Sequence, residues 1–367
     1  MARDQRSFME RQHSLPLRKE TIMRRNVIIL LVMVLLILGH SASFAQTPAS
    51  EPFPQRQVTL ANGVKGENVK FDSGNPPTYA SIVAGEVPPP LAVDAKLFLP
   101  PGQAPFPAVI IVPGSGGVLP AYFDTANTLT SAGIAAFIVD PFAARGIIDT
   151  RSDQSQLTWA ASTYDVFAAL KFLMTRHGII PTKIGANGSS RGGTAVLQAA
   201  MRPLAKGALG AGKRLAAVLP AYPWCGMQFR EPDTGKTPIR FLMGDKDNWV
   251  SVVQCQAYEQ AIEFRNPNCS IRLFPGAAHG FDGGAPLTEI PNAVKALLAP
   301  ISYMNNEGIF FDYRSGRYDP VYNDAAMVKH GIDSGFLERG VKVGSRPGEP
   351  EAFRQDMVDF FVHTLKD

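Results

Sequence analysis

Two neighbouring serines stand between glycines in the stretch NGSSRGGTAV, residues 187–196, and one of them has the surroundings of a catalytic nucleophile. A serine on a sharp turn between a strand and a helix needs small residues two positions before and two after it, because the backbones nearly touch there. Ser190 has Gly188 and Gly192 at these positions, whereas Ser189 has larger residues on both sides. The local sterics therefore select Ser190, with a plain glycine-rich turn as the alternative.

A serine hydroxyl is a weak nucleophile without a neighbouring base, so the histidines come next. His279 lies in the glycine-rich loop FPGAAHGFDGG directly after an expected strand, which is a suitable place for a catalytic base. His330 is the second candidate, although no expected strand precedes it. The other histidines lie in the N-terminal leader or in expected helices. We expect His279 to be the base.

An acid that orients the imidazole should follow another strand end, between the serine and the histidine in the chain. The stretch FLMGDKDNWV offers Asp245 and Asp247 directly after Gly244. Either carboxylate could orient the base, and either could be an ordinary turn aspartate. The chain order of serine, acid and histidine holds for both.

Backbone amides that could stabilise an oxyanion stand in two similar turns. One is the N–H of Arg191, the residue after the nucleophile. The second would come from the loop PGSGG at 113–117, where Ser115 or Gly116 could supply it. The strand sequence AVIIV in front of this loop favours that role over a flexible glycine turn.

Apolar runs and amphipathic stretches alternate through most of the chain at the spacing of strand–helix–strand units. With 45% hydrophobic and 19% charged residues, the chain has the composition of a folded protein with a full core. The alternation predicts an α/β fold with a mostly parallel sheet and helices on both faces, where ligands meet the carboxyl ends of the strands. The expected strands are 92–100, 107–114, 133–142, 183–188, 214–223, 238–244 and 270–276, and the expected helices are 122–133, 156–177, 190–201, 251–265 and 350–365.

Together these motifs resemble the dienelactone hydrolase family of the α/β-hydrolase superfamily. The resemblance covers about residues 90–290 and the last helix. It rests on the sequences PAVIIVPGSGG, DPFAARG, GSSRGG, MGDKDNW and PGAAHGFD. The resemblance implies an α/β-hydrolase fold in a single domain over 58–367. It also implies an acid three residues after the strand-end glycine, which selects Asp247 over Asp245.

Two features depart from that family. Dienelactone hydrolase proper has a cysteine nucleophile where this chain has Ser190, which favours a general esterase over an enzyme for the muconate-pathway lactone. Residues 303–345 match no part of the family pattern.

In related exported members, a cysteine after the YP strand end occurs together with one in the helix after the acid. This co-occurrence implies a disulfide between Cys225 and Cys255.

The N-terminal residues have the pattern of a signal peptide. Seven of the 36 basic and three of the 32 acidic side chains lie in residues 1–26, so the rest of the chain carries no net charge, and nucleic-acid binding is not expected. An uncharged apolar run at 27–38 and small residues before Gln46 follow. They predict a signal peptide over 1–45, with the true start at Met23. An uncleaved N-terminal anchor is the alternative.

Cleavage would leave a polar linker over 46–57, no stable membrane span, and a mature protein in the periplasm or outside the cell. Such a compartment is oxidising, so disulfides can persist there. None of the three cysteines has the spacing of metal ligands, and no metal site is expected.

These observations predict a serine hydrolase that cleaves a small-molecule carboxylic ester or lactone without a metal or an organic cofactor. Phe142, Trp224 and Trp249 follow strand ends and could wall its apolar pocket, although ordinary core aromatics look the same in a sequence. Arg145 could meet an acidic group of the substrate or form a structural ion pair with Asp165. The alternatives are a peptidase or acyltransferase of the same fold, and a non-catalytic exported binding protein with a relic triad. The sequence carries no signal for the oligomeric state.

Overall fold

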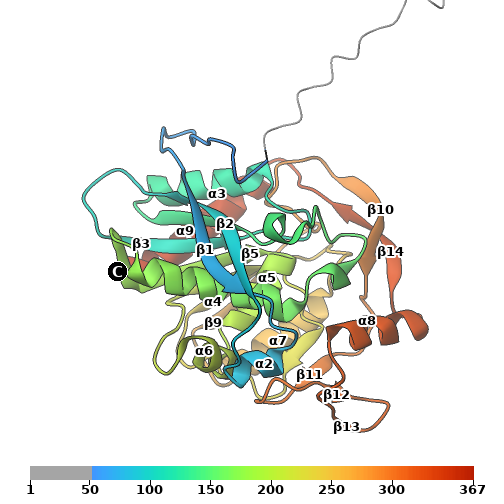
Figure 1. Cartoon of the computed structure of the whole chain (residues 1–367). Helices are drawn as coiled ribbons and strands as arrows, with labels where there is room; N and C mark the ends of the chain where they lie inside the picture. The colour runs from blue at the N-terminus through green and yellow to red at the C-terminus, as the bar shows by residue number, and fades with distance from the viewer. Residues whose placement is uncertain (1–51) are drawn as a thin grey trace, which may run out of the picture. The chain divides into compact units, whose positions relative to one another are not determined.

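The computed structural model describes residues 52–367 (Figure 1). These residues form one compact unit. The expected signal peptide over 1–45, with its start at Met23, and residues 46–51 of the expected linker lie outside the described residues. No helix among residues 52–367 is both long enough and apolar enough to cross a membrane.

An eight-stranded sheet forms the centre of the protein, with its strands in the order β1-β2-β4-β3-β5-β6-β8-β9. The pairings of β1 with β2 and of β2 with β4 are antiparallel, and every later pairing is parallel. The mostly parallel sheet expected from the sequence is therefore confirmed. The strands are β1 (Glu67–Gly74), β2 (Pro90–Phe98), β3 (Phe106–Val112), β4 (Ala135–Asp140), β5 (Ile179–Ser189), β6 (Val218–Ala221), β8 (Ile239–Gly244) and β9 (Cys269–Phe274).

The central strands are buried on both faces, as their uninterrupted apolar sequences require. Every residue of β4 (AAFIVD) is buried, and so is every residue of β3 (FPAVIIV) after the first. Parallel strands covered by helices on both sides have no face toward water, so each position can be apolar. The edge strand β1 (ENVKFDSG) is mostly polar and partly exposed, and for that reason the apolar pattern of the sequence did not predict it.

Helices cover both faces of the sheet. Figure 1 shows α3 and α9 on one face and α4, α5 and α6 on the other. Phe361 of α9 packs so closely on Gly185 of β5 that a Cβ there would collide with the ring. The helices are α2 (Tyr79–Val83), α3 (Pro120–Ser131), α4 (Trp159–Thr175), α5 (Arg191–Ala199), α6 (Arg202–Leu209), α7 (Val252–Glu263) and α9 (Glu349–Leu365).

Residues 288–343, which we call the outer segment, contain elements that the sequence did not assign. β10 and β14 pair as an antiparallel ribbon, β11 pairs with β7 of the main body, and β12 pairs with β13. Figure 1 shows β10, β14 and α8 together at one side of the central sheet. The elements of the outer segment are β10 (Thr288–Lys295), β11 (Ser302–Met304), β12 (Phe311–Asp312), β13 (Arg317–Tyr318), α8 (Asp324–Asp333) and β14 (Glu338–Val343), and the β7 strand that pairs with β11 is Met227–Phe229.

Candidate active site

Ser190 stands at the tight turn between β5 and α5. Its backbone has φ 55° and ψ −117°, a strained conformation that few residues other than glycine adopt. A Cβ on Gly188 would collide with the backbone of Gly192, and a Cβ on Gly192 would collide with the backbone of Val112 in β3. The two glycines are therefore required by the close approach of the strand and the helix.

The structure brings the side chains of Ser190, His279 and Asp247 together. Oγ of Ser190 lies 2.8 Å from Nε2 of His279. Nδ1 of the same ring lies 2.7 Å from Oδ2 of Asp247. The side chains of His279 and Asp247 are only 3% and 0% exposed, so water does not compete for their contact. An imidazole that donates from Nδ1 to a carboxylate presents a lone pair on Nε2, which can accept a serine proton.

Backbone amides fix the carboxylate of Asp247. Its Oδ1 accepts hydrogen bonds from the N–H groups of Trp249 (2.8 Å) and Val250 (3.0 Å), while Oδ2 faces the imidazole. The other candidate acid, Asp245, lies outside this cluster, because its Oδ1 accepts a hydrogen bond from the amide of Gly276 at 2.5 Å. The acid in contact with the base is thus the one that the family pattern selects.

The loop after β9 holds His279 between two aromatic rings. The centroid of the imidazole lies 4.7 Å from that of Tyr222 and 4.8 Å from that of Trp249. The backbone carbonyl of His279 accepts a hydrogen bond from the N–H of Gly344, directly after β14, at 2.9 Å. His279 also forms an isolated β-bridge with Val343 of β14, so the position of the imidazole depends on the outer segment as well as on the central sheet.

The two amides expected to face an oxyanion belong to fixed turns. Arg191 begins α5, so its N–H has no partner within the helix. In the loop after β3, the hydroxyl of Ser115 accepts a hydrogen bond from the side-chain amide of Gln154 at 3.0 Å. The neighbouring amide, that of Gly114, already donates to the hydroxyl of Tyr122 at 2.8 Å. These two hydrogen bonds hold the loop in place. Because the Gly114 amide already has a partner, the Ser115 amide is the candidate donor to an oxyanion.

A cavity of about 620 Å³ opens beside Ser190, and both Ser115 and Arg191 line it. This volume lies within the range of small-molecule binding sites. The predicted aromatic residues Trp224 and Trp249 line the cavity, and so does a third tryptophan at the start of α4 that the sequence did not single out. The nucleophile candidate and both amide candidates therefore share one concave site with three tryptophans in its lining.

The outer segment supplies a wall of this cavity that sequence reasoning missed. The apolar residues on α8 are spaced four positions apart, so they share one face of the helix, and this spacing is the signal that could have revealed them. The lining residues from the outer segment and the turn after β10 are Val294, Lys295, Ala296, Val328, Ile332, Leu337, Glu338 and Arg339.

Several residues singled out in the sequence have other surroundings. Phe142 is buried in a small separate apolar cluster and does not line the cavity, which corrects the predicted pocket. His330, on α8, pairs with the hydroxyl of Ser334 at 3.2 Å instead of joining the site. Arg145 forms a buried ion pair with Asp165 at 2.8 Å, which confirms the structural alternative.

Residues 52–367 hold no group of three or more His, Cys, Asp or Glu side chains placed to bind a metal ion.

A buried acid lies behind the nucleophile turn. Oδ1 of Asp282 accepts a hydrogen bond from the hydroxyl of Tyr222 at 2.5 Å, and Oδ2 accepts one from the hydroxyl of Ser189 at 3.3 Å. Burial raises the pKa of Asp282, and these hydrogen bonds oppose the rise. The hydroxyl of Ser189, which the sterics exclude as the nucleophile, is thus buried and donates to Asp282 instead of facing the cavity.

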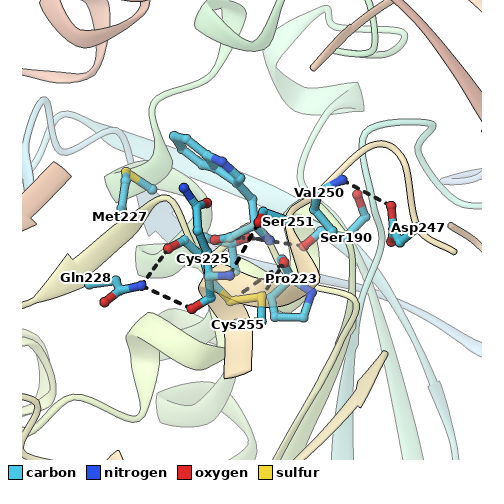
Figure 2. The surroundings of a disulfide bond; sticks show 12 residues. Ser190, Pro223, Cys225, Met227, Gln228, Asp247, Val250, Ser251 and Cys255 are labelled. Carbon is cyan, nitrogen blue, oxygen red and sulfur yellow. Dashed lines mark hydrogen bonds between the residues drawn. A yellow bond between two sulfur atoms is a disulfide. The ribbon is translucent and has the colours of Figure 1, made fainter. Parts of the chain in front are cut away.

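A disulfide joins Cys225, after β6, to Cys255 in α7, the pair that the family resemblance implies. Figure 2 shows its surroundings, which include both Ser190 and Asp247. The third cysteine, Cys269, is buried and free. The disulfide therefore ties the loop after β6 to the helix that follows the acid.

Known proteins with similar sequences and structures include several hydrolases. The family model described as "Dienelactone hydrolase family" matches residues 93–299. A Bradyrhizobium protein described as "Probable 2-oxo-3-(5-oxofuran-2-ylidene)propanoate lactonase" is 26% identical over 192 residues, which are 48% of this chain and 73% of that protein. A solved structure named m3DLH is 16% identical with a TM-score of 0.50, over 82% of this chain and 99% of that one. A dienelactone hydrolase-like promiscuous phosphotriesterase from metagenomic libraries is 15% identical with a TM-score of 0.46, over 82% and 98%.

The match to the family model spans more than half of the chain and includes Ser190, Asp247 and His279. The likeness to m3DLH shows a shared fold, which agrees with the α/β-hydrolase arrangement of the sheet and its helices. The chain belongs to the dienelactone hydrolase family and is a hydrolase that acts on ester bonds.

Proposed function

We propose that the protein hydrolyses carboxylic esters or lactones through a covalent acyl-enzyme on Ser190. The observation that carries this proposal is the unbroken hydrogen-bonded line from Ser190 through His279 to Asp247, at the edge of a cavity. A nucleophile, a base and an orienting acid in this geometry are the parts that acyl transfer needs.

In the first half of the reaction, Oγ of Ser190 attacks the carbonyl carbon while Nε2 of His279 takes the hydroxyl proton. Asp247 accepts the hydrogen bond from Nδ1 and stabilises the imidazolium that forms. The tetrahedral intermediate then collapses, the bond to the alcohol oxygen breaks, and His279 gives its proton to that oxygen. In a lactone, the alcohol released in this step stays attached to the acyl group.

Water completes the reaction. His279 takes a proton from water as the water oxygen attacks the acyl carbon, and it returns this proton to Oγ of Ser190 as the acid leaves. The N–H groups of Arg191 and Ser115 stabilise the oxyanion in both halves, with about 3 kcal/mol from each donor at sites of this kind. Neither step requires a metal or an organic cofactor.

Two observations support esters and lactones as the substrate classes. The Bradyrhizobium relative carries the name of a lactonase, which supports a cyclic ester. The serine at position 190, where dienelactone hydrolase proper has a cysteine, supports a general esterase activity. The same attack on a carbonyl carbon serves both classes, so one site can act on open and cyclic esters.

We also propose that the mature protein acts in the periplasm or outside the cell. The basic leader and the apolar run at 27–38 have the pattern of a cleavable signal peptide. The disulfide between Cys225 and Cys255 supports export, since disulfides persist in oxidising compartments. N-terminal sequencing of the protein from its native cells should begin at Gln46, and a sequence that begins at Met23 would contradict cleavage.

Labelling with a fluorophosphonate probe tests the nucleophile. The wild-type protein should be labelled, and Ser190→Ala should lose both the label and the hydrolysis of p-nitrophenyl acetate. Ser189→Ala is the matched control and should keep its label, because this neighbouring hydroxyl bonds to Asp282 instead. An unlabelled wild-type protein would favour a non-catalytic binding protein, and cleavage of peptide amides would favour a peptidase.

A further inference from the structure

All three tryptophans of the chain line the cavity beside Ser190. They come from separate parts of the sequence: Trp159 begins α4, Trp224 follows β6, and Trp249 follows β8. Their rings meet at one cavity, where Trp224 is half-buried and Trp159 and Trp249 are 6% and 9% exposed, and the chemistry of the nucleophile and its base does not require these rings.

Trp159 and Trp224 form a fixed pair. Their ring centroids are 5.1 Å apart, and their planes are tilted by 38°. The guanidinium of Arg191 stacks 4.2 Å from the centroid of Trp159. The backbone N–H of Trp224 donates to the hydroxyl of Thr194 at 2.8 Å. Because the pair is already ordered, a flat ligand group that binds to it incurs a smaller entropic cost.

Trp249 connects the reacting side chains to the outer segment. Its ring lies beside the imidazole of His279, and its indole N–H donates to the carbonyl of Val294 at 2.8 Å. Val328 and Ile332 of α8 add aliphatic surface to the same cavity. Ile332 is 61% exposed, so it offers apolar surface at the rim of the cavity.

The charged side chains around the cavity already have protein partners. Lys295 pairs with Glu338 at 3.3 Å. Arg339 donates to a backbone carbonyl at 2.6 Å, and Asp153 accepts a hydrogen bond from an amide of its own turn at 2.9 Å. The guanidinium of Arg191 is buried and donates to the backbone and side chain of the loop before α4. An uncharged ring would leave these contacts intact.

We propose that this cavity selects esters that carry an uncharged aromatic ring near the reacting carbonyl. The inference rests on the ester hydrolysis proposed above and names the substrate class for the same site. An aromatic ring can pack edge-to-face or offset against an indole, and this interaction adds to the burial of apolar surface. A saturated ring of the same size is buried equally but cannot form it.

Two esters separate aromatic recognition from ligand size. Benzyl acetate and cyclohexylmethyl acetate share the same acetyl group and differ in whether the six-membered ring is aromatic. The kcat/KM for benzyl acetate should exceed that for cyclohexylmethyl acetate by about fivefold. 4-Carboxybenzyl acetate should be no better a substrate than benzyl acetate. Equal values for the two uncharged rings, or a preference for the carboxylated ring, would overturn the inference.

Variants locate the selectivity in the cavity. Trp224→Leu should reduce the ratio between the two rings to within about twofold of unity, because it removes an indole surface. Phe264→Leu is the matched control, since it also exchanges an aromatic residue for leucine, at a 91% exposed position that does not line the cavity. This control should keep the wild-type ratio. A wild-type ratio in Trp224→Leu would count against the inference.

Binding to Ser190→Ala distinguishes this inference from the proposed function. The variant lacks the nucleophile, and every tryptophan of the chain lines the cavity, so intrinsic fluorescence reports binding without turnover. Tighter binding of benzyl acetate than of cyclohexylmethyl acetate supports the inference even if the wild-type protein hydrolyses neither. Equal binding, or no binding of either, overturns it even if the wild-type protein hydrolyses both.

Discussion

The carboxylate of Asp324, at the start of α8, accepts a hydrogen bond from the backbone N–H of Trp159, the first residue of α4, at 2.6 Å. This contact joins the outer segment to the helix that begins with one of the three cavity tryptophans. Burial raises the pKa of Asp324 to about 6, while the bond from Trp159 and the charge of Arg191 oppose the rise. The anchor of α8 therefore titrates above the ordinary range of a carboxylate.

Asp324→Asn should raise the free energy of unfolding above that of the wild type near pH 7. Near pH 4 the two proteins should be about equally stable. The pKa of Asp324 in the folded protein lies above the ordinary value of about 4, so folding favours its protonated form. The resulting stability is fully present below about pH 4 and is lost as the pH rises through about 6, on the order of 3 kcal/mol in all. The asparagine keeps an acceptor for Trp159 without a charge. Urea unfolding at several pH values between 4 and 7 measures the difference.

The control for this titration is Asp333→Asn, at the other end of α8. Its side chain is 57% exposed and pairs with Lys329 at the surface. The free energy of unfolding of this variant should follow that of the wild type across the same pH range. If the difference between Asp324→Asn and the wild type stays constant with pH, Asp324 does not titrate as described.

Gly188→Ala should destabilise the fold by about 3 kcal/mol or more, because the new Cβ has no space beside the backbone of Gly192. Gly116→Ala is the matched control. Its Cβ would lie 3.6 Å from Cδ1 of Leu119, an ordinary contact, and the change should cost less than about 1 kcal/mol. Chemical denaturation of both variants measures these effects. Similar stabilities for the two would contradict the close approach of β5 and α5.

Arg145→Met should lower the free energy of unfolding by about 3–5 kcal/mol, because it leaves the buried carboxylate of Asp165 without its partner. Lys329→Met breaks an exposed pair with Asp333 and should cost less than about 1 kcal/mol. The double variant Arg145→Met with Asp165→Leu should recover part of the loss, since no charge then stays buried. Urea unfolding of the three variants measures the comparison, and equal losses in the two single variants would argue against the buried pair.

Replacement of both Cys225 and Cys255 by serine should lower the free energy of unfolding by about 2–4 kcal/mol. A reducing agent should destabilise the wild-type protein by a similar amount and leave the double variant unchanged. Cys269→Ser removes the free thiol and should leave the sensitivity to the reducing agent intact. Alkylation of all three cysteines in the unreduced protein, detected by mass spectrometry, would contradict the disulfide.

Local sequence was sufficient to identify the nucleophile candidate and the site's position on the sheet. The choice of Ser190 over Ser189 follows from the two flanking glycines, because the clash that Gly188 avoids involves Gly192 in the same turn, although the clash that Gly192 avoids involves Val112 of β3. The placement of His279 and of the acid loop follows from the apolar strands before them, since parallel strands bring their carboxyl ends to one edge. Burial patterns along single strands are local properties, so the apolar strands of the central sheet were predictable too, and the polar edge strand β1 was not.

Contacts between distant residues were decided by the tertiary structure. The pairing of β10 with β14 joins segments separated by more than 40 residues, and no turn motif or apolar repeat in the chain marks it. No local motif marks the approach of α8 to Trp159 either, or the burial of Phe142 away from the cavity.

The sequence by itself determined which residues could attack an ester, because the required types and sterics lie within short turns. The tertiary structure alone decided what surrounds the ester. The walls of the cavity come from α4, the loops after β6 and β8, and the outer segment. The distances between these parts depend on the folded path of the whole chain, which no local pattern encodes.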